Sequence, residues 1–215
     1  MTRLLPRLLD QVDLPPAELR AARIDGQLFA VDEAFAVIGE PDSAELRAVA
    51  LAPLVPDRMI VERSSALWVY GARAEAPFRH QLCMDMANRT TPHHSLRFEY
   101  RECRLERGDV VQLGELKITS HLRTAIDLLR TCEPFAAADA LDVLAVLQLG
   151  GSGVSECARC IRTQPRYPGV RRALARLASI DRSGLSLPLG SQPAARSQPD
   201  ARSQPAARSQ PALTR

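Results

Sequence analysis

The first 60 residues combine helical patterns with one pair of strand patterns. The predicted elements are helices over 4–9, 14–23 and 44–52 and strands over 27–31 and 34–38. Asp42-Ser43 is expected to cap the third helix and Pro53 to end it. Asp32-Glu33 joins the two strands into a hairpin. Two helices followed by a hairpin form the outline of a reduced winged helix, since a full helix-turn-helix unit of this kind has three helices.

Residues 55–118 mix strand patterns with one helix. The strands are predicted over 81–86, over 96–101 and, around a turn at Gly114, in two short segments of 110–118. Side chains alternate along 96–101, so Leu96, Phe98 and Tyr100 are expected to face inward.

The remaining predicted elements are helices, and the first of them lies within residues 55–118. One short helix is predicted over 65–71, where Ser64 or Ser65 can cap its start and Gly71 ends it. Further helices are predicted directly after Thr119 and over 136–149, 154–162 and 168–178. The fold class expected from these elements is α+β, with a reduced winged helix followed by a mixed α/β domain that ends in a helical part.

Three segments are expected along the chain. They are a winged-helix-like unit over 1–53, an α/β domain over 54–183 and a tail over 184–215. The tail repeats the hexapeptide Ser-Gln-Pro-Ala-Ala-Arg and offers almost no bulky apolar side chain to bury. We therefore expect it to be disordered, because nothing offsets the entropy of ordering it.

The charge of the chain is unevenly distributed. The net charge is +3, yet residues 1–60 hold 6 Arg against 10 Asp and Glu. A nucleic-acid binder usually has a basic footprint, so this acidic start weighs against simple DNA binding. No apolar run is long enough for a signal core or a membrane span, and the cysteines number five, an odd count. A cytoplasmic protein with free thiols and no membrane contact is expected.

Two groups of residues could hold a metal. Cys157 and Cys160 have the spacing of half a zinc site or a redox pair, but on a helix both can simply pack against the core. His93 and His94 would point to opposite faces of a strand. The sequence offers neither a phosphate-binding Gly-rich loop nor a nucleophile motif. We expect no metal, no cofactor and no enzymatic activity.

The segment after Thr119 combines hydroxyl and charged side chains. Thr119, Ser120 and Thr124 favour capping of the helix start. Arg123 and Asp127 stand four residues apart, as in an intrahelical ion pair. The alternative is that Arg123 and Thr124 hold an anion or a carboxylate of a partner.

The candidate DNA contacts lie on the second predicted helix and just after it. Arg20 and Arg23 are one turn apart and would point from one face, which suits phosphate or base contacts from a recognition helix. A solvated helix face is the alternative interpretation. Gln27 is the third candidate.

With these motifs together, the chain resembles the actinobacterial AbiEi-like antitoxins of type IV toxin–antitoxin systems. The resembling stretches, in the expected order, are 18–23, 26–37, 65–71, 119–128 and 168–174. The resemblance implies that one set of motif residues is structural: Ser65, Trp68, Gly71, Thr119, Arg123, Thr124 and Asp127. The sequence departs from the family pattern at His121, which replaces a common proline, and in its short leading helix with acidic surroundings.

The resemblance also implies a function. It suggests a DNA-binding antitoxin and transcriptional autorepressor, whose partners are operator DNA and a nucleotidyltransferase-like toxin encoded nearby. The repeat tail stands where some relatives carry a nuclease-like domain, so nuclease activity does not carry over. The alternatives are an orphan protein-binding or regulatory protein without DNA binding and a degenerate nuclease.

Overall fold

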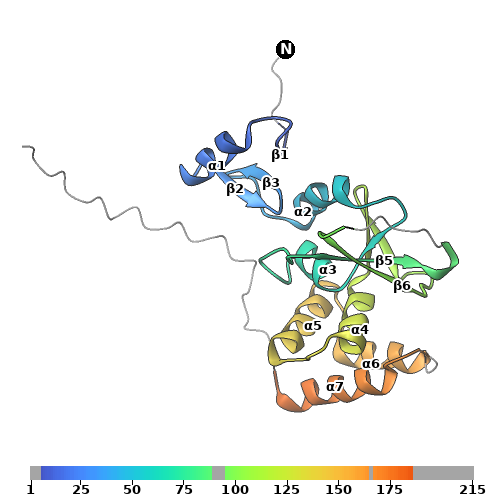
Figure 1. The fold of residues 1–215 in the computed structure, drawn as a ribbon. Coiled ribbons are helices and arrows are strands. Elements are labelled where there is room, and N and C mark those ends of the chain that lie inside the picture. The colour runs from blue at the N-terminus through green and yellow to red at the C-terminus, as the bar shows by residue number, and fades with distance from the viewer. Residues whose placement is uncertain (1–5, 89–94, 165–166, 186–215) are drawn as a thin grey trace, which may run out of the picture.

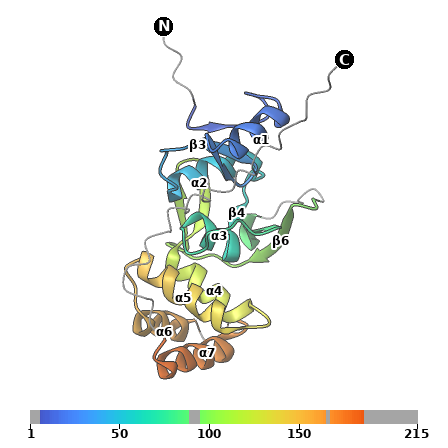
Figure 2. The ribbon, with the colours of Figure 1, turned by 90° about the vertical axis from the view of Figure 1, so that its left-hand side faces the viewer.

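Two β-sheets of different size organise the chain, which is an α+β fold (Figure 1). The computed structural model describes residues 6–88, 95–164 and 167–185. The smaller sheet lies at one end of the molecule, the helices α4 to α7 lie at the other, and the larger sheet lies between them (Figures 1 and 2).

The smaller sheet contains three antiparallel strands in the order β1-β3-β2. Its strands are β1 (Leu8–Leu9), β2 (Leu28–Val31) and β3 (Ala34–Val37). The predicted hairpin is confirmed, with Asp32 in its turn at a φ of +57°. Helix α1 (Pro16–Ile24) packs on this sheet through Leu19, which is buried in one apolar cluster with Leu9 and Leu28.

The helix predicted over 4–9 is wrong for the residues that the structure describes. Leu8 and Leu9 form strand β1, which pairs with Ala36 and Phe35 of the hairpin. Backbone pairing with the hairpin edge therefore prevails over the helical spacing of the leucines. Within residues 6–43, a single helix, α1, precedes the hairpin, so two helices of a helix-turn-helix are not found there.

The larger sheet contains five strands in the order β6-β5-β4-β8-β7. Its strands are β4 (Ile60–Val61), β5 (His80–Asp85), β6 (Phe98–Cys103), β7 (Val110–Leu113) and β8 (Leu116–Thr119). The β4–β8 and β5–β6 pairs are parallel, and the other two pairs are antiparallel. Leu96 was predicted to face inward, but it precedes β6 and is 91% exposed. Phe98 is buried as predicted.

Six helices and two 3₁₀ turns complete the described chain. They are α2 (Ala44–Leu51), α3 (Arg63–Val69), α4 (His121–Thr131), α5 (Ala137–Leu149), α6 (Val154–Thr163) and α7 (Val170–Ser183), with the 3₁₀ turns Ala52–Leu54 and Met86–Asn88. Helix α2 begins as predicted, because the Ser43 hydroxyl accepts a hydrogen bond from the Leu46 amide at 3.2 Å. Helix α3 begins earlier than predicted. Glu62 is its N-cap residue, so Ser64 and Ser65 lie inside it rather than at its cap.

Helix α3 lies between two apolar cores. Trp68 is buried in a core that joins the small sheet and α2 to the larger sheet. The preceding residue, Leu67, is buried in the second core, which α4 to α7 form. The first core includes Leu46 and Val61, so it crosses the boundary expected at residues 53 and 54, and that boundary stays a prediction.

Within the described segments, no single helix has both the length and the apolar character needed to cross a membrane. Helices α5 and α6 are long and apolar enough only when taken together, and the chain bends by 95° between them. The predicted tail begins at Gly184, which follows α7, and its residues from 186 on lie outside the described residues.

We predict that Leu46→Ala destabilises the protein much more than Val49→Ala on the same helix. Leu46 is fully buried, whereas Val49 is 49% exposed. Leu46→Ala should lower the free energy of unfolding by about 2–5 kcal/mol because it leaves a cavity, and Val49→Ala by about 0.5 kcal/mol or less. Urea unfolding followed by circular dichroism measures both. Equal effects would contradict the assignment of Leu46 to the core.

Candidate functional site: a buried ion cluster and the exposed face of α1

The serines of the first motif attach α3 to strand β5. The Ser65 hydroxyl is buried, accepts a hydrogen bond from the Gln81 amide at 2.8 Å and lies 3.1 Å from His80 Nδ1. Gln81 Oε1 in turn accepts hydrogen bonds from the amide and the hydroxyl of Ser64. The two serines therefore fix the start of α3 on the larger sheet.

Trp68 attaches α3 to α2, and Gly71 follows the end of α3. The Trp68 carbonyl accepts a hydrogen bond from Arg47 at 2.5 Å, and the Arg47 guanidinium lies 5.6 Å from the centre of the indole ring. Arg47 also pairs with Asp42 at 2.7 Å. Gly71 follows the helix with a φ of +82° and donates its amide hydrogen to the Trp68 carbonyl. Such a backbone conformation favours glycine.

An ion pair connects the small sheet to the larger one. The Asp32 carboxylate in the hairpin turn accepts a hydrogen bond from Arg97 at 2.5 Å and lies 3.2 Å from His80 Nε2. Burial raises the pKa of the Asp32 carboxyl, but the interactions with His80 and Arg97 outweigh this effect and lower it below its usual value.

The second motif forms the start of α4. Ser120 is the N-cap residue, and its hydroxyl accepts a hydrogen bond from the Arg123 amide at 3.4 Å. The hydroxyls of Thr119 and Thr124 lie 2.7 Å apart, and both residues are fully buried. Because Thr124 is engaged inside the protein, the structure does not present it to an anion or a partner.

Arg123 and Asp127 form the ion pair that their spacing predicts, at 2.8 Å. The pair is buried, with Arg123 3% and Asp127 1% exposed. Arg123 also pairs with Asp109 and donates to the Arg104 carbonyl at 3.1 Å. The few tenths of a kcal/mol typical of an exposed helical pair therefore do not apply, because buried charges carry a large desolvation penalty.

Arg101 of β6 extends this pair into a cluster. Its guanidinium lies 3.2 Å from Asp127 Oδ2 and donates from Nε to Glu62 at 3.0 Å. Glu62 is fully buried and also pairs with Arg63 at 3.0 Å. Burial opposes the charge of Arg101, but Glu62 and Asp127 outweigh it and raise the pKa of its guanidinium. We call Glu62, Arg101, Asp109, Arg123 and Asp127 the ion cluster.

A third arginine approaches the cluster without completing it. Arg130 Nη1 lies 3.8 Å from Asp127 Oδ1, an oxygen that has no hydrogen-bond partner in the structure. Arg130 instead donates to the Pro168 carbonyl at 2.8 Å and lies 4.9 Å from the centre of the Tyr167 ring. Burial and then the positive charges of Arg123 and Arg101 lower the pKa of Arg130, against the effect of Asp127.

A cavity of about 390 Å³ lies beside the ion cluster. Its charged and thiol lining residues are Arg101, Glu102, Cys103, Arg104, Arg123, Asp127, Arg130 and Arg172. Arg101, Arg123 and Arg130 on its wall are held in place by carboxylates or carbonyls, so the cavity offers fixed hydrogen-bond donors rather than a proton-transfer pair.

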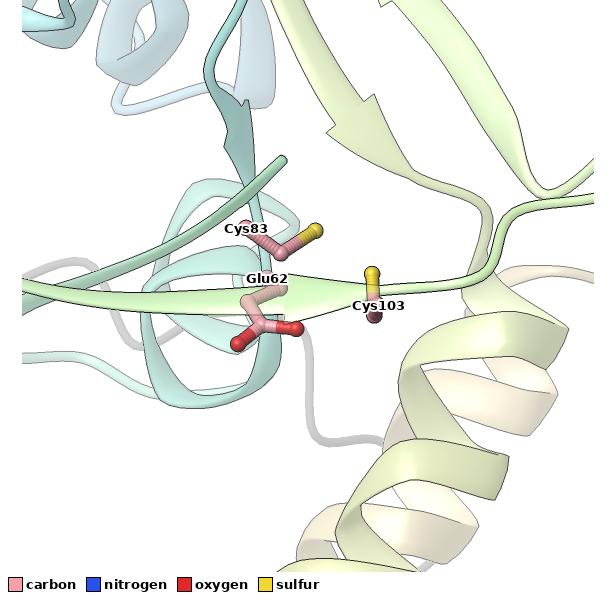
Figure 3. Close-up of side chains that lie close together, drawn as sticks. All are labelled: Glu62, Cys83 and Cys103. Carbon is pink, nitrogen blue, oxygen red and sulfur yellow. The ribbon is translucent and has the colours of Figure 1, made fainter. Parts of the chain in front are cut away.

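One group of possible metal ligands exists in the described part of the chain. Glu62, Cys83 and Cys103 are all buried, and their donor atoms lie within 4.8 Å of one another (Figure 3). Both oxygens of Glu62 already accept hydrogen bonds from Arg101, and one also accepts from Arg63. A divalent cation would have to displace these guanidinium groups, so the donor set does not fit a metal well.

The metal ligands considered from the sequence, two cysteines and two histidines, lie elsewhere in the chain. Cys157 and Cys160 lie on α6 and pack in the second core, where burial raises the pKa of the Cys157 thiol to about 12. This agrees with the packing interpretation of their spacing. His93 and His94 lie outside the described residues.

The three candidate DNA contacts lie in or just after α1, an element at the opposite end of the molecule from α4 to α7 (Figure 1). Arg20 and Arg23 are exposed on α1, and Gln27 is exposed just before β2. Neither arginine has an ion-pair partner among the residues that the structure describes. Ile24, one turn after Arg20, is 85% exposed.

Comparisons with known proteins add little to this geometry. No protein-family model and no curated protein matches the chain. Among solved structures, the chain is similar to the RV2827C protein from Mycobacterium tuberculosis, with 16% sequence identity, coverage of 80% of this chain and 76% of that chain, and a TM-score of 0.33. A similarity of this size does not establish a shared fold.

We predict that Asp127→Asn is strongly destabilising. The change removes the carboxylate that Arg101 shares with the buried Arg123, and the free energy of unfolding should fall by about 3–5 kcal/mol. The exposed Asp57→Asn serves as control and should change it by about 0.5 kcal/mol or less. Thermal and urea unfolding measure both variants. A loss at Asp127 no larger than at Asp57 would show that the cluster does not hold α4.

We predict that the Asp32 carboxylate stabilises the folded protein near neutral pH and that this contribution is lost at acid pH. Its pKa in the folded protein lies below the reference value of 3.8, so its contribution is complete above that value and is lost as the pH falls through the folded-state pKa. Asp32→Asn should flatten the loss of stability below about pH 5. Urea midpoints across the acid range test this, again with Asp57→Asn as control. An unchanged acid slope would contradict it.

Proposed function

We propose that this chain is a DNA-binding regulator of the antitoxin type that works in the cytoplasm. In this proposal α1 contacts operator DNA, the β2–β3 hairpin acts as a wing that follows this single helix, and the chain represses its own operon. It also counteracts a nucleotidyltransferase-like toxin encoded nearby. The proposal assigns no catalytic residue, metal or cofactor.

The observation that carries the proposal is the exposed face of α1. Arg20 and Arg23 lie one turn apart, and no carboxylate among the described residues pairs with either of them, whereas Arg47 and Arg123 are buried in ion pairs. Free guanidinium groups on one helix face suit bidentate contacts with phosphate or guanine. Leu19, on the flank of this face, packs the helix on the small sheet, so the presenting surface is held in place.

We predict that the double change Arg20→Ala and Arg23→Ala weakens binding to a duplex from the region upstream of the gene by about tenfold or more. The dependence of log affinity on log salt should become shallower by about 2 if both residues contact phosphates. Arg162→Ala with Arg171→Ala removes two exposed helical arginines elsewhere and should have little effect. Electrophoretic mobility shift and fluorescence anisotropy measure these changes.

Two results would reject the DNA-binding half of the proposal. One is the absence of a shift at low salt, where phosphate contacts are strongest. The other is an equal loss of affinity in both double variants.

A second candidate function is binding of a protein without DNA. Ile24, next to Arg23 in the sequence, is 85% exposed, and Val12, in the segment before α1, is 89% exposed, so this end has apolar side chains at its surface. Mixed apolar and charged surfaces are typical of protein interfaces. This function would be favoured if the neighbouring gene product co-purifies with the wild type and with the double arginine variant but not with Ile24→Asp. The protein should in that case give no DNA shift.

A further inference from the structure

Two thiols face each other beside the ion cluster, away from the proposed DNA contacts. Cys83 of β5 pairs in register with Arg101 of β6, and Cys103 follows Arg101 by two residues. Side chains two residues apart on a strand share a face, so both thiols lie on the same side of the sheet. Figure 3 shows the sulfur of Cys83 directed towards Cys103, and the two sulfurs lie within 4.8 Å.

The two thiols differ in how readily they ionise. A hydrogen bond from Cys83, together with the positive charges of Arg123 and Arg101, lowers the pKa of Cys103 despite its burial and the charge of Glu62. The same hydrogen bond, burial and Glu62 raise the pKa of Cys83. Cys103 is therefore the more readily ionised thiol of the pair, and Cys83 the less readily ionised one. A thiolate is the nucleophilic form of cysteine.

The two thiols also differ in access. Cys103 is 8% exposed and lines the cavity of about 390 Å³, whereas Cys83 is fully buried behind it. A small neutral oxidant that enters the cavity meets Cys103 first, between Arg101 and Arg123. Redox-active cysteines are found near positive charges and within reach of small molecules, and Cys103, although 8% exposed, lies on the cavity wall beside arginines.

We propose that Cys103 is a site of oxidation by hydrogen peroxide and that Cys83 resolves the product as an intrachain disulfide. The Cys103 thiolate attacks one peroxide oxygen, the O–O bond breaks, and the departing hydroxide takes up a proton and leaves as water. Sulfur is oxidised to sulfenic acid while peroxide is reduced. The Cys83 sulfur then attacks the Cys103 sulfur, and the S–O bond breaks. Hydroxide leaves as a second water with the Cys83 proton.

The chain provides its own control for this chemistry. Cys157 and Cys160 form a second close pair on α6, but burial raises the pKa of Cys157 to about 12, and its nearest charged influences are Cys160 and Glu156 rather than an arginine. That pair should remain reduced under conditions that oxidise the pair on β5 and β6. Iodoacetamide at neutral pH should modify Cys103 at least about tenfold faster than Cys157.

The test uses the full-length reduced protein treated with one equivalent of hydrogen peroxide. Two thiols should be lost in a thiol titration under denaturing conditions and recovered with dithiothreitol. A tryptic map should contain peptide 80–89 joined to peptide 102–104, with a mass two hydrogens below the sum of the two. Cys83→Ser should lose one thiol and leave a sulfenic acid on Cys103 that dimedone traps. Cys103→Ser should protect Cys83, and Cys157→Ser should react like the wild type.

Several results would overturn the proposal. They are an intact thiol count at peroxide concentrations that oxidise free cysteine, a disulfide between Cys157 and Cys160 instead, or equal oxidation of Cys83 in the Cys103→Ser protein. Stoichiometric zinc released by a thiol reagent from protein purified without chelator would assign the pair to a metal instead. The wild-type peptide map needs no variant, so failure of a variant to fold leaves the proposal testable.

Discussion

The attachment of α4 to the larger sheet depends on one buried carboxylate, that of Asp127. Arg123 of the same helix and Arg101 of β6 share it, and Glu62 and Asp109 complete the charge balance. Each of these charges loses its hydration on folding, and only the full set of partners offsets that loss. The cluster therefore specifies where α4 sits more than it adds to the net free energy of folding. Helices α5, α6 and α7 share the core of α4 and follow its position.

The second constraint is the short helix α3, which has a core on each side. Leu67 belongs to the core of the C-terminal helices, and Trp68 belongs to the core shared by both sheets. Glu62 stands at the N-cap position of the helix, and its carboxylate belongs to the ion cluster. A change in the position of α3 would disturb both cores and the cluster together. The motif at 65–71 thus connects the two cores, which explains why its residues face inward and present no reactive group to solvent.

Local rules predicted the elements whose signals lie close together in the sequence. Ser43 capping α2 and the pattern around Asp32 both depend on residues a few positions apart. The sequence could not distinguish a helix from strand β1, because paired leucines suit either. Helical spacing predicted the Arg123–Asp127 pair but not its burial, which depends on residues distant in sequence, Arg101 of β6 and Glu62 at the start of α3. The Cys83–Cys103 pair depends on the parallel register of β5 and β6, which no local pattern reports.

The acidic surroundings of α1 limit how this helix could recognise DNA. Around it, residues 1–60 hold more acidic than basic residues, so the long-range field does not attract a polyanion. At about 0.1 M salt, charges more than about 10 Å apart are largely screened, and the contact would depend on what Arg20, Arg23 and Gln27 touch directly. Phosphate-driven, sequence-independent binding would be weak under these conditions. A regulator built this way would gain its affinity at base edges, so it would bind its own operator far better than bulk DNA.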